Sequence, residues 1–288
     1  MSLRISRPKS RSDGLAAIPS VDWWVTSRCT LTCDFCYGPR PTVDPVRLRD
    51  AICDAIRASP TPVVTFCGGE PLLVKKIFDY ARIQRAAGKS TVLNTNGELL
   101  VRRFARRHDV PFDVVGISID GPDASTHRLM RGAEADFDST YAAARWLTEQ
   151  SFTGKRKIAS VVSAVNRDRI DDLAAMVREL APDVWRIYQY SPWGPQNYGQ
   201  ARHRISEADF AEIAARAAEM AAPVPVRASS ASSTGGCFIV DPSGRILQTL
   251  GDGYEAVGNC LDEPVEDIWR RLPQQSVITS NKRWLRTI

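Results

Sequence analysis

Short apolar runs alternate with longer amphipathic stretches along most of this 288-residue chain. Six of the runs are rich in β-branched and aromatic residues, a composition that predicts strands. They cover residues 21–26, 62–67, 90–93, 114–119, 158–165 and 184–190. Helical spacing of apolar residues predicts helices over residues 45–59, 72–87, 99–108, 137–150 and 170–180. Strands that alternate with helices over short connections predict a parallel sheet covered by helices.

We therefore expect an α/β fold, a partial (β/α)6 TIM-type barrel with a short C-terminal appendage. In such barrels, functional side chains gather on the loops that follow the strands. Five segments with polar or cysteine residues fall there, at residues 29–36, 68–71, 94–97, 120–122 and 191–197. Their shared position predicts one common site at the carboxyl ends of the strands.

The alternating pattern changes after residue 220. Helical spacing over residues 207–220 is followed by a Pro-, Ser- and Ala-rich stretch at 223–236, which we expect to be a loop. Asp241-Pro242-Ser243-Gly244 is a strong turn signal and predicts a hairpin, and residues 264–272 predict a closing helix. We expect a flexible basic tail at residues 1–20, the core barrel at 21–204, and a C-terminal helix, hairpin and closing helix at 205–288.

Composition disfavours two classes of partner. The net charge of +5 is small for a chain of this length, so we expect no specific nucleic-acid binding. No apolar run reaches the roughly 18 residues of a membrane-spanning helix, so we expect no membrane partner. The seven cysteines are odd in number and three lie within eight residues, which favours a cytoplasmic metal site over a secreted disulfide framework.

The three clustered cysteines are Cys29, Cys33 and Cys36, in the spacing C-x3-C-x2-C. Cysteine thiolates hold iron–sulfur clusters, and a 4Fe–4S cluster held by three of them keeps one iron open for another ligand. The same thiolates fit part of a zinc site, which takes four ligands. A zinc-stabilised binding module therefore remains open as an alternative to an enzyme.

In this context the chain resembles the radical SAM (S-adenosylmethionine) superfamily over about residues 21–200. The likeness rests on the cysteine loop with its aromatic Phe35, on Gly68-Gly69-Glu70-Pro71, on Thr95-Asn96-Gly97 and on Ser118-Ile119-Asp120-Gly121. It implies one 4Fe–4S cluster on the three loop cysteines, with SAM bound to the open iron. It also implies that an electron donor such as flavodoxin or ferredoxin drives SAM cleavage to a 5′-deoxyadenosyl radical, which abstracts hydrogen from a substrate.

The same resemblance assigns the contacts to SAM. Glu70 and the two glycines before it would meet the methionine amine, because glycine allows close backbone approach and a carboxylate pairs with an ammonium. Arg131 would hold the SAM carboxylate through its planar fork of donors. The full set is Phe35, Gly68, Gly69, Glu70, Asn96, Ser118, Asp120, Arg131 and Ser163.

Polar and aromatic residues of the sixth strand mark a candidate substrate side, although the aromatic ones also suit core packing. Alternation places Arg186, Tyr188 and Tyr190 on one strand face and residues 185, 187 and 189 on the other, and one of the two faces would point into the barrel. Lys157 and Asn197 complete the candidate substrate-binding set. The cations at 157 and 186 are similar to those of viperin-type radical SAM enzymes, which act on nucleotides. Val184 and Asp120-Gly121 differ from that pattern, which argues against a nucleoside triphosphate.

The C-terminal segment looks like a shortened SPASM/twitch appendage. Cys237, the turn at 241–244, Gly258-Asn259 and Ile268-Trp269 fit its frame. Two cysteines, Cys237 and Cys260, are too few for a second cluster. Each is a candidate hydrogen donor, as in epimerases of this superfamily, or a small buried apolar residue.

The leading hypothesis is hydrogen abstraction from a polar small molecule in specialised biosynthesis. The preferred substrates are a nucleoside, nucleotide or aminosugar, and the outcomes considered are epimerisation, dehydrogenation and dehydration. A peptide-modifying radical SAM enzyme is the alternative.

Overall fold

The computed structural model describes residues 18–38, 44–107, 109–192, 200–232, 238–250 and 253–272. These residues form one sheet of ten strands in the order β10-β9-β8-β1-β2-β3-β4-β5-β6-β7. The strands are β1 Val21–Thr26, β2 Val63–Gly68, β3 Ser90–Thr95, β4 Val114–Ser118, β5 Lys155–Val162, β6 Val184–Gln189, β7 Val226–Ser229, β8 Phe238–Val240, β9 Arg245–Leu250 and β10 Gly253–Asn259. The α-helices are α1 Arg49–Ala58, α2 Ile77–Ala86, α3 Leu100–Phe104, α4 Ala124–Arg131, α5 Phe137–Glu149, α6 Ile170–Leu180, α7 Glu207–Met220 and α8 Val265–Arg270.

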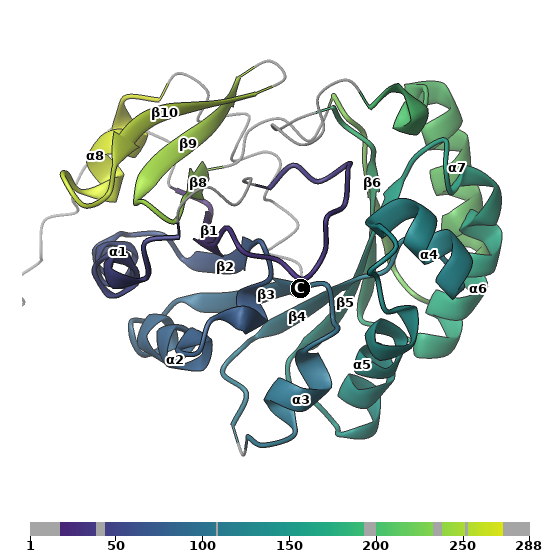
Figure 1. Ribbon diagram of the computed structural model, residues 1–288, viewed down its shortest axis with the longest axis horizontal. Helices are drawn as coiled ribbons and strands as arrows, with labels where there is room; N and C mark the ends of the chain where they lie inside the picture. The colour runs from purple at the N-terminus through teal and green to yellow at the C-terminus, as the bar shows by residue number, and fades with distance from the viewer. Residues whose placement is uncertain are drawn as a thin grey trace, which may run out of the picture.

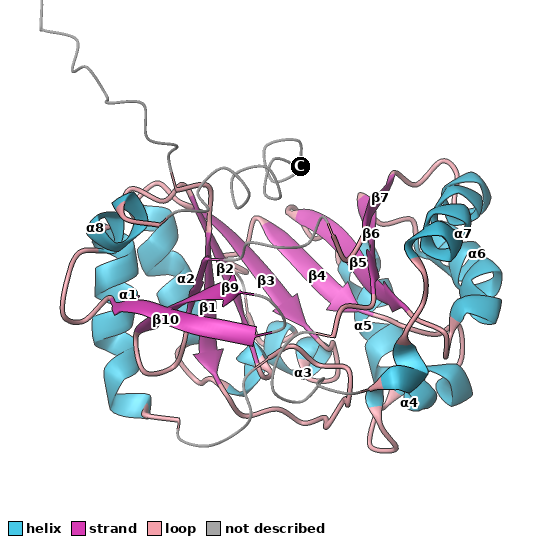
Figure 2. Ribbon diagram, turned by 90° about the horizontal axis from the view of Figure 1, so that it is seen from above, coloured by secondary structure: helices cyan, strands magenta, loops and turns pink. Residues whose placement is uncertain are grey.

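Strands β1 to β7 lie side by side in chain order and run parallel. β8 pairs parallel with β1, and β9 and β10 follow antiparallel, so the appendage extends the first edge of the sheet. Figures 1 and 2 show a curved sheet with α1, α2, α5, α6 and α7 along its outer side. The predicted α/β partial barrel with a C-terminal appendage is therefore confirmed.

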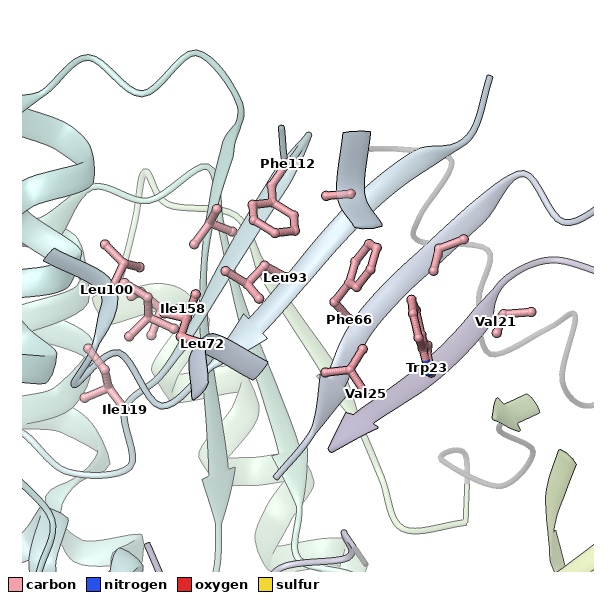
Figure 3. Packing of buried hydrophobic residues seen from close by; sticks show 14 of the residues in the cluster. Val21, Trp23, Val25, Phe66, Leu72, Leu93, Leu100, Phe112, Ile119 and Ile158 are labelled. Carbon is pink, nitrogen blue, oxygen red and sulfur yellow. The ribbon is translucent and has the colours of Figure 1, made fainter. Parts of the chain in front are cut away.

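The main hydrophobic core lies between the helices and the outer face of the sheet. Trp23, Phe66 and Leu93 point from β1, β2 and β3 into this layer (Figure 3), and all three are fully buried. The helices supply residues such as Ile52 and Phe78 to the same cluster. Because strand side chains alternate between faces, the residues between these apolar ones must lie on the opposite, inner face.

Two elements of the C-terminal part differ from the sequence prediction. The expected loop at 223–236 contains β7, which pairs with β6 and continues the parallel series. The expected hairpin also gains a third strand, β10. Both strands lie at edges of the sheet and bury little, so their sequences carry only weak apolar alternation. None of the described helices is long and apolar enough to cross a bilayer.

Candidate functional site

The inner face of the sheet carries polar side chains across five neighbouring strands, β3 to β7. Strand register places Asn94, Gly116 and Lys157 in one row. The next row on the same face holds Ser118, Arg186 and Arg227. Residues that share a row in a parallel sheet point to the same side, so these groups lie on one face of the sheet. We expect this inner face to be the substrate side, and Arg186 and Tyr188 both lie on it because alternation puts them on the same face of β6.

The cysteine loop follows β1, and its successive side chains lie alternately in a buried cluster and against neighbouring loops. Leu31, Cys33 and Phe35 are buried and pack with Met130 of α4 and with Tyr190 after β6. Thr30 and Thr32 turn toward neighbouring loops instead, where their hydroxyls donate to Glu98 (2.7 Å) and Glu134 (3.3 Å). The loop is therefore fixed from both sides.

The chemistry of this loop fits an iron–sulfur cluster. Burial raises the pKa of Cys33 to about 12, and the nearby Arg131 charge opposes the shift. A thiolate there needs a cationic partner, which a metal cluster supplies. The backbone amides of Leu31 and Gly38 donate to the sulfurs of Cys29 (3.4 Å) and Cys36 (3.3 Å), and such bonds tune cluster sulfurs.

The loop is less suited to a single metal ion. Among the described ranges, no three Cys, His, Asp or Glu side chains surround a point at metal-ligand distance. In a cluster, each thiolate binds its own iron, so the three sulfurs need not converge on one point. Cys29, Cys33 and Cys36 would hold a 4Fe–4S cluster and leave its fourth iron to another ligand.

The Gly68-Gly69 pair brings the end of β2 against the start of the cysteine loop. Gly68 has a positive φ of 116°, which favours glycine. The amides of Gly69 and Glu70 donate to the carbonyls of Thr26 and Arg28, each at 2.8 Å. These glycines therefore set the position of the chain that leads into Cys29, in addition to their predicted contact with SAM.

Glu70 also makes contacts within the protein that its predicted role does not include. Its carboxylate is buried and accepts bonds from the amides of Leu72 (2.9 Å) and Asn96 (2.9 Å) and from the hydroxyl of Thr95 (2.8 Å). Burial raises its pKa to about 7. These contacts use the carboxylate to join two strand-end loops, while its pairing with the methionine ammonium stays a prediction.

Asn96 and Ser163 also bind other parts of the protein. The Asn96 amide donates to Thr30 of the cysteine loop at 2.8 Å. Ser163 is fully buried, and its hydroxyl lies 3.2 Å from His203 and accepts a bond from the amide of Val165. Both contacts favour a role in holding the loops, while a SAM contact at either residue stays a prediction.

Arg131 and Asp120 form a buried ion pair beside the cysteine loop. Nε of Arg131 lies 2.6 Å from Oδ2 of Asp120, and the guanidinium is 5.8 Å from the ring of Phe35. Asp120 is completely buried and also accepts a bond from the amide of Val161 at 2.7 Å. Asp120 thereby orients Arg131, which stays the predicted partner of the SAM carboxylate, whereas Asp120 itself is enclosed by protein.

Asp120→Asn should destabilise the protein by about 3–5 kcal/mol, because it leaves the buried Arg131 charge without its carboxylate. Urea unfolding of the reconstituted enzyme under anaerobic conditions measures this loss. The matched control is Asp123→Asn, since the Asp123–Arg169 pair is about 40% exposed on both sides and asparagine can still cap α4. The control should cost less than about 1 kcal/mol, and equal losses would refute the buried-pair argument.

Of the two candidate hydrogen donors, only Cys260 lies among the described residues. Cys260 is buried in the main core with Phe238 and Trp269, and burial raises its pKa to about 12. That apolar position on the helix side of the sheet argues against hydrogen transfer from Cys260. Cys237 and the predicted substrate residue Asn197 both lie outside the described residues.

Two residues of the site region were missed by the sequence analysis. Arg227 lies opposite Arg186, in a segment that had been expected to be a loop. His203 is fully buried beside the cysteine loop and contacts Asp34. Arg227 could be recognised only from the pairing of β7 with β6, and no local sequence pattern marks His203.

Comparison with known proteins agrees with this geometry. The model of the Radical SAM superfamily matches residues 24–177, more than half of the chain. An AdoMet-dependent heme synthase of Nitratidesulfovibrio vulgaris is 24% identical over 72% of this chain, which spans 57% of that protein's length. An S-adenosylmethionine-dependent nucleotide dehydratase of Flammeovirga pacifica is 24% identical, and the match covers 88% of this chain and 91% of that protein.

Solved structures share the fold. Streptococcus suis SuiB, bound to S-adenosylmethionine, superposes with a TM-score of 0.70 at 16% identity, over 92% of this chain and 69% of SuiB. The anSMEcpe structure with bound AdoMet and a peptide gives 0.68 at 18% identity, over 90% and 82% of the two chains. At these identities the likeness concerns the fold alone, but the family match covers the cysteine loop and the four strand ends around it. The chain therefore belongs to the radical SAM superfamily and is a radical SAM enzyme.

Proposed function

We propose that this enzyme abstracts hydrogen from an anionic polar small molecule, with a nucleotide as the preferred class. Membership of the superfamily implies one 4Fe–4S cluster and SAM, which together supply a 5′-deoxyadenosyl radical once a reductant delivers one electron. The abstraction transfers one hydrogen atom from a substrate C–H bond to the 5′ carbon, so it yields 5′-deoxyadenosine and a substrate radical. The loop cysteines would hold the cluster, and the inner face would hold the substrate.

The observation that carries this proposal is the group of cations on the inner face. Lys157 and Arg186 are 3% and 5% exposed, which is rare for charged side chains. Lys157 Nζ donates to Oδ1 of Asn94 at 2.6 Å, and Arg186 donates to the hydroxyl of Ser229 at 2.8 Å. Arg227 adds a third, exposed cation in the row of Arg186. Fixed cations on one face complement a phosphate or carboxylate.

Lys157 reaches its position because β4 has no side chain in its way. A Cβ at Gly116 would lie 2.3 Å from Cε of Lys157. The lysine therefore crosses β4 above Gly116 to reach Asn94 on β3. This path holds the ammonium near the middle of the inner face, where it can meet an anion.

The other side of the inner face is aromatic. Trp24 of β1 lies edge-on to Tyr254 of β10, with ring centroids 5.2 Å apart, and Tyr37 lies 6.3 Å from the same indole. Rings on one side and cations on the other suit a molecule with a planar base and an anionic group. The likeness to a nucleotide dehydratase over most of both chains also supports this class.

A panel of candidate substrates tests the proposal. Anaerobically reconstituted enzyme, reduced with dithionite, would be supplied with nucleotides, nucleosides, aminosugars and short peptides. We expect nucleotides to stimulate 5′-deoxyadenosine formation most. Stronger stimulation by the peptides, the nucleosides or the aminosugars would overturn the proposal and leave the radical SAM chemistry intact.

Lys157→Met should raise the KM for the stimulating nucleotide about tenfold or more, because it removes a charged hydrogen-bond donor from the anion. SAM cleavage without substrate should change little. Lys155→Met is the matched control, since Lys155 lies on the same strand but is half-exposed and pairs with Asp183. Equal KM values for the two variants would show that Lys157 does not bind the substrate.

We also propose that the reductant is a flavodoxin or ferredoxin and that the enzyme works in the cytoplasm. None of the six described cysteines forms a disulfide, as is usual in a reducing compartment.

A further inference from the structure

His203 joins the cysteine loop to the end of β5. It lies in the short 3-10 helix Ala201–His203 and is fully buried. Its Nε2 lies 2.9 Å from Oδ1 of Asp34, and its Nδ1 lies 3.2 Å from the hydroxyl of Ser163. Because a carboxylate only accepts, Nε2 carries the proton, and the neutral ring then accepts at Nδ1 from Ser163. One imidazole thus connects two loops that are far apart in the sequence.

The imidazole also packs on aromatic residues of the site. Its centroid lies 5.6 Å from the ring of Phe35 and 5.3 Å from that of Tyr190. Phe35 stands directly before Cys36, and Asp34 stands directly after Cys33. His203 therefore touches both residues that separate two of the cluster cysteines.

Arg202 is a suitable comparison for His203, because both side chains contact Asp34. It also pairs with Asp34, but its side chain is 52% exposed, whereas that of His203 is not exposed at all. An exposed ion pair contributes little, because water screens it and both side chains lose freedom. A buried hydrogen bond to a carboxylate is worth more, and losing it leaves a polar group without its partner.

We infer that His203 is a positioning residue that fixes the Cys33–Cys36 part of the cysteine loop through Asp34. In doing so it couples the cluster and its SAM to the chain that follows β6, the strand that carries Arg186 and Tyr188. The role concerns cluster retention and SAM binding, and it does not depend on which substrate the enzyme uses.

Iron release tests this inference without measuring turnover. His203→Phe keeps the ring and its packing but removes both hydrogen bonds. In the reconstituted enzyme it should speed iron loss to the chelator bathophenanthroline roughly tenfold. Arg202→Gln, which removes only the exposed partner, should stay within about twofold of the unchanged protein. The EPR signal of the reduced cluster, and its change when SAM is added, should differ in His203→Phe and not in Arg202→Gln.

A second pair of variants decides the matter if His203→Phe fails to fold. Asp34→Asn retains an acceptor for Nε2, so it should hold iron as well as the unchanged protein does. Asp34→Ala removes that acceptor and should release iron roughly tenfold faster, after allowance for the effect of Arg202→Gln. Equal iron release and equal EPR spectra in Asp34→Ala and Asp34→Asn would overturn the inference, as would equal behaviour of folded His203→Phe and Arg202→Gln.

Discussion

Cys33→Ala should reduce 5′-deoxyadenosine formation by the reconstituted, dithionite-reduced enzyme to the level of a no-enzyme blank. Cys33 is buried with Leu31 and Phe35 in the middle of the cysteine loop, and its position between Cys29 and Cys36 makes it the central thiol of the three. Loss of one of only three protein thiolates leaves too few ligands to hold a 4Fe–4S cluster. The iron content per chain should fall together with the activity.

The matched control for this variant is Cys53→Ala. Cys53 is another buried thiol, but it lies in α1, where its sulfur contacts only the side-chain amide of Gln84 among its described hydrogen bonds. We expect this variant to retain its iron and its SAM cleavage. Iron near four per chain with SAM cleavage in Cys33→Ala would disprove the assignment of the cluster loop. One tightly bound zinc without any SAM cleavage, in the unchanged protein, would instead favour a binding module.

The parallel sheet could be predicted because its strands are buried, mostly apolar runs that alternate with amphipathic helices along the chain. All six predicted strands are present, from β1 to β6, although their ends differ by a few residues. The edge strands β7 and β10 could not be found in this way, since a strand that buries little needs no apolar pattern. β7 depends on pairing with β6, which is distant in sequence, whereas β10 pairs with β9, which comes just before it along the chain.

The site residues likewise include some that the sequence could place and others whose contacts it could not predict. Alternation along β6 could group Arg186 with Tyr188 on one face, because that step uses only the period of a strand, but which face points inward follows from the folded sheet. The contacts of Glu70 could not be predicted, since its partners Thr95 and Asn96 come from the next strand end. A motif names the residues that recur in a family, but only the folded chain shows whether a carboxylate faces the ligand or another loop.

Gly69→Ala should destabilise the protein by about 3–5 kcal/mol and cause loss of the cluster. A Cβ at this position would lie 2.0 Å from the carbonyl oxygen of Arg28 and 2.5 Å from its carbonyl carbon. Both atoms belong to the backbone, so no side chain can rotate away to make room. The chain before Cys29 would have to move, which breaks the two backbone bonds from Gly69 to Thr26 and from Glu70 to Arg28.

Gly253→Ala is the matched control, because a Cβ at Gly253 in β10 would meet no atom within 4 Å. This substitution should change the free energy of unfolding by less than about 1 kcal/mol and leave the iron content unchanged. Urea unfolding and iron determination on both variants separate a general effect of the added methyl group from a local clash. If Gly69→Ala unfolds at the same urea concentration as Gly253→Ala and keeps its iron, the close approach of β2 to the cysteine loop is not what holds the cluster site together. If instead iron is lost while the unfolding midpoint falls only slightly, the clash acts on the cysteine loop alone, and Gly69 serves the cluster more than the fold.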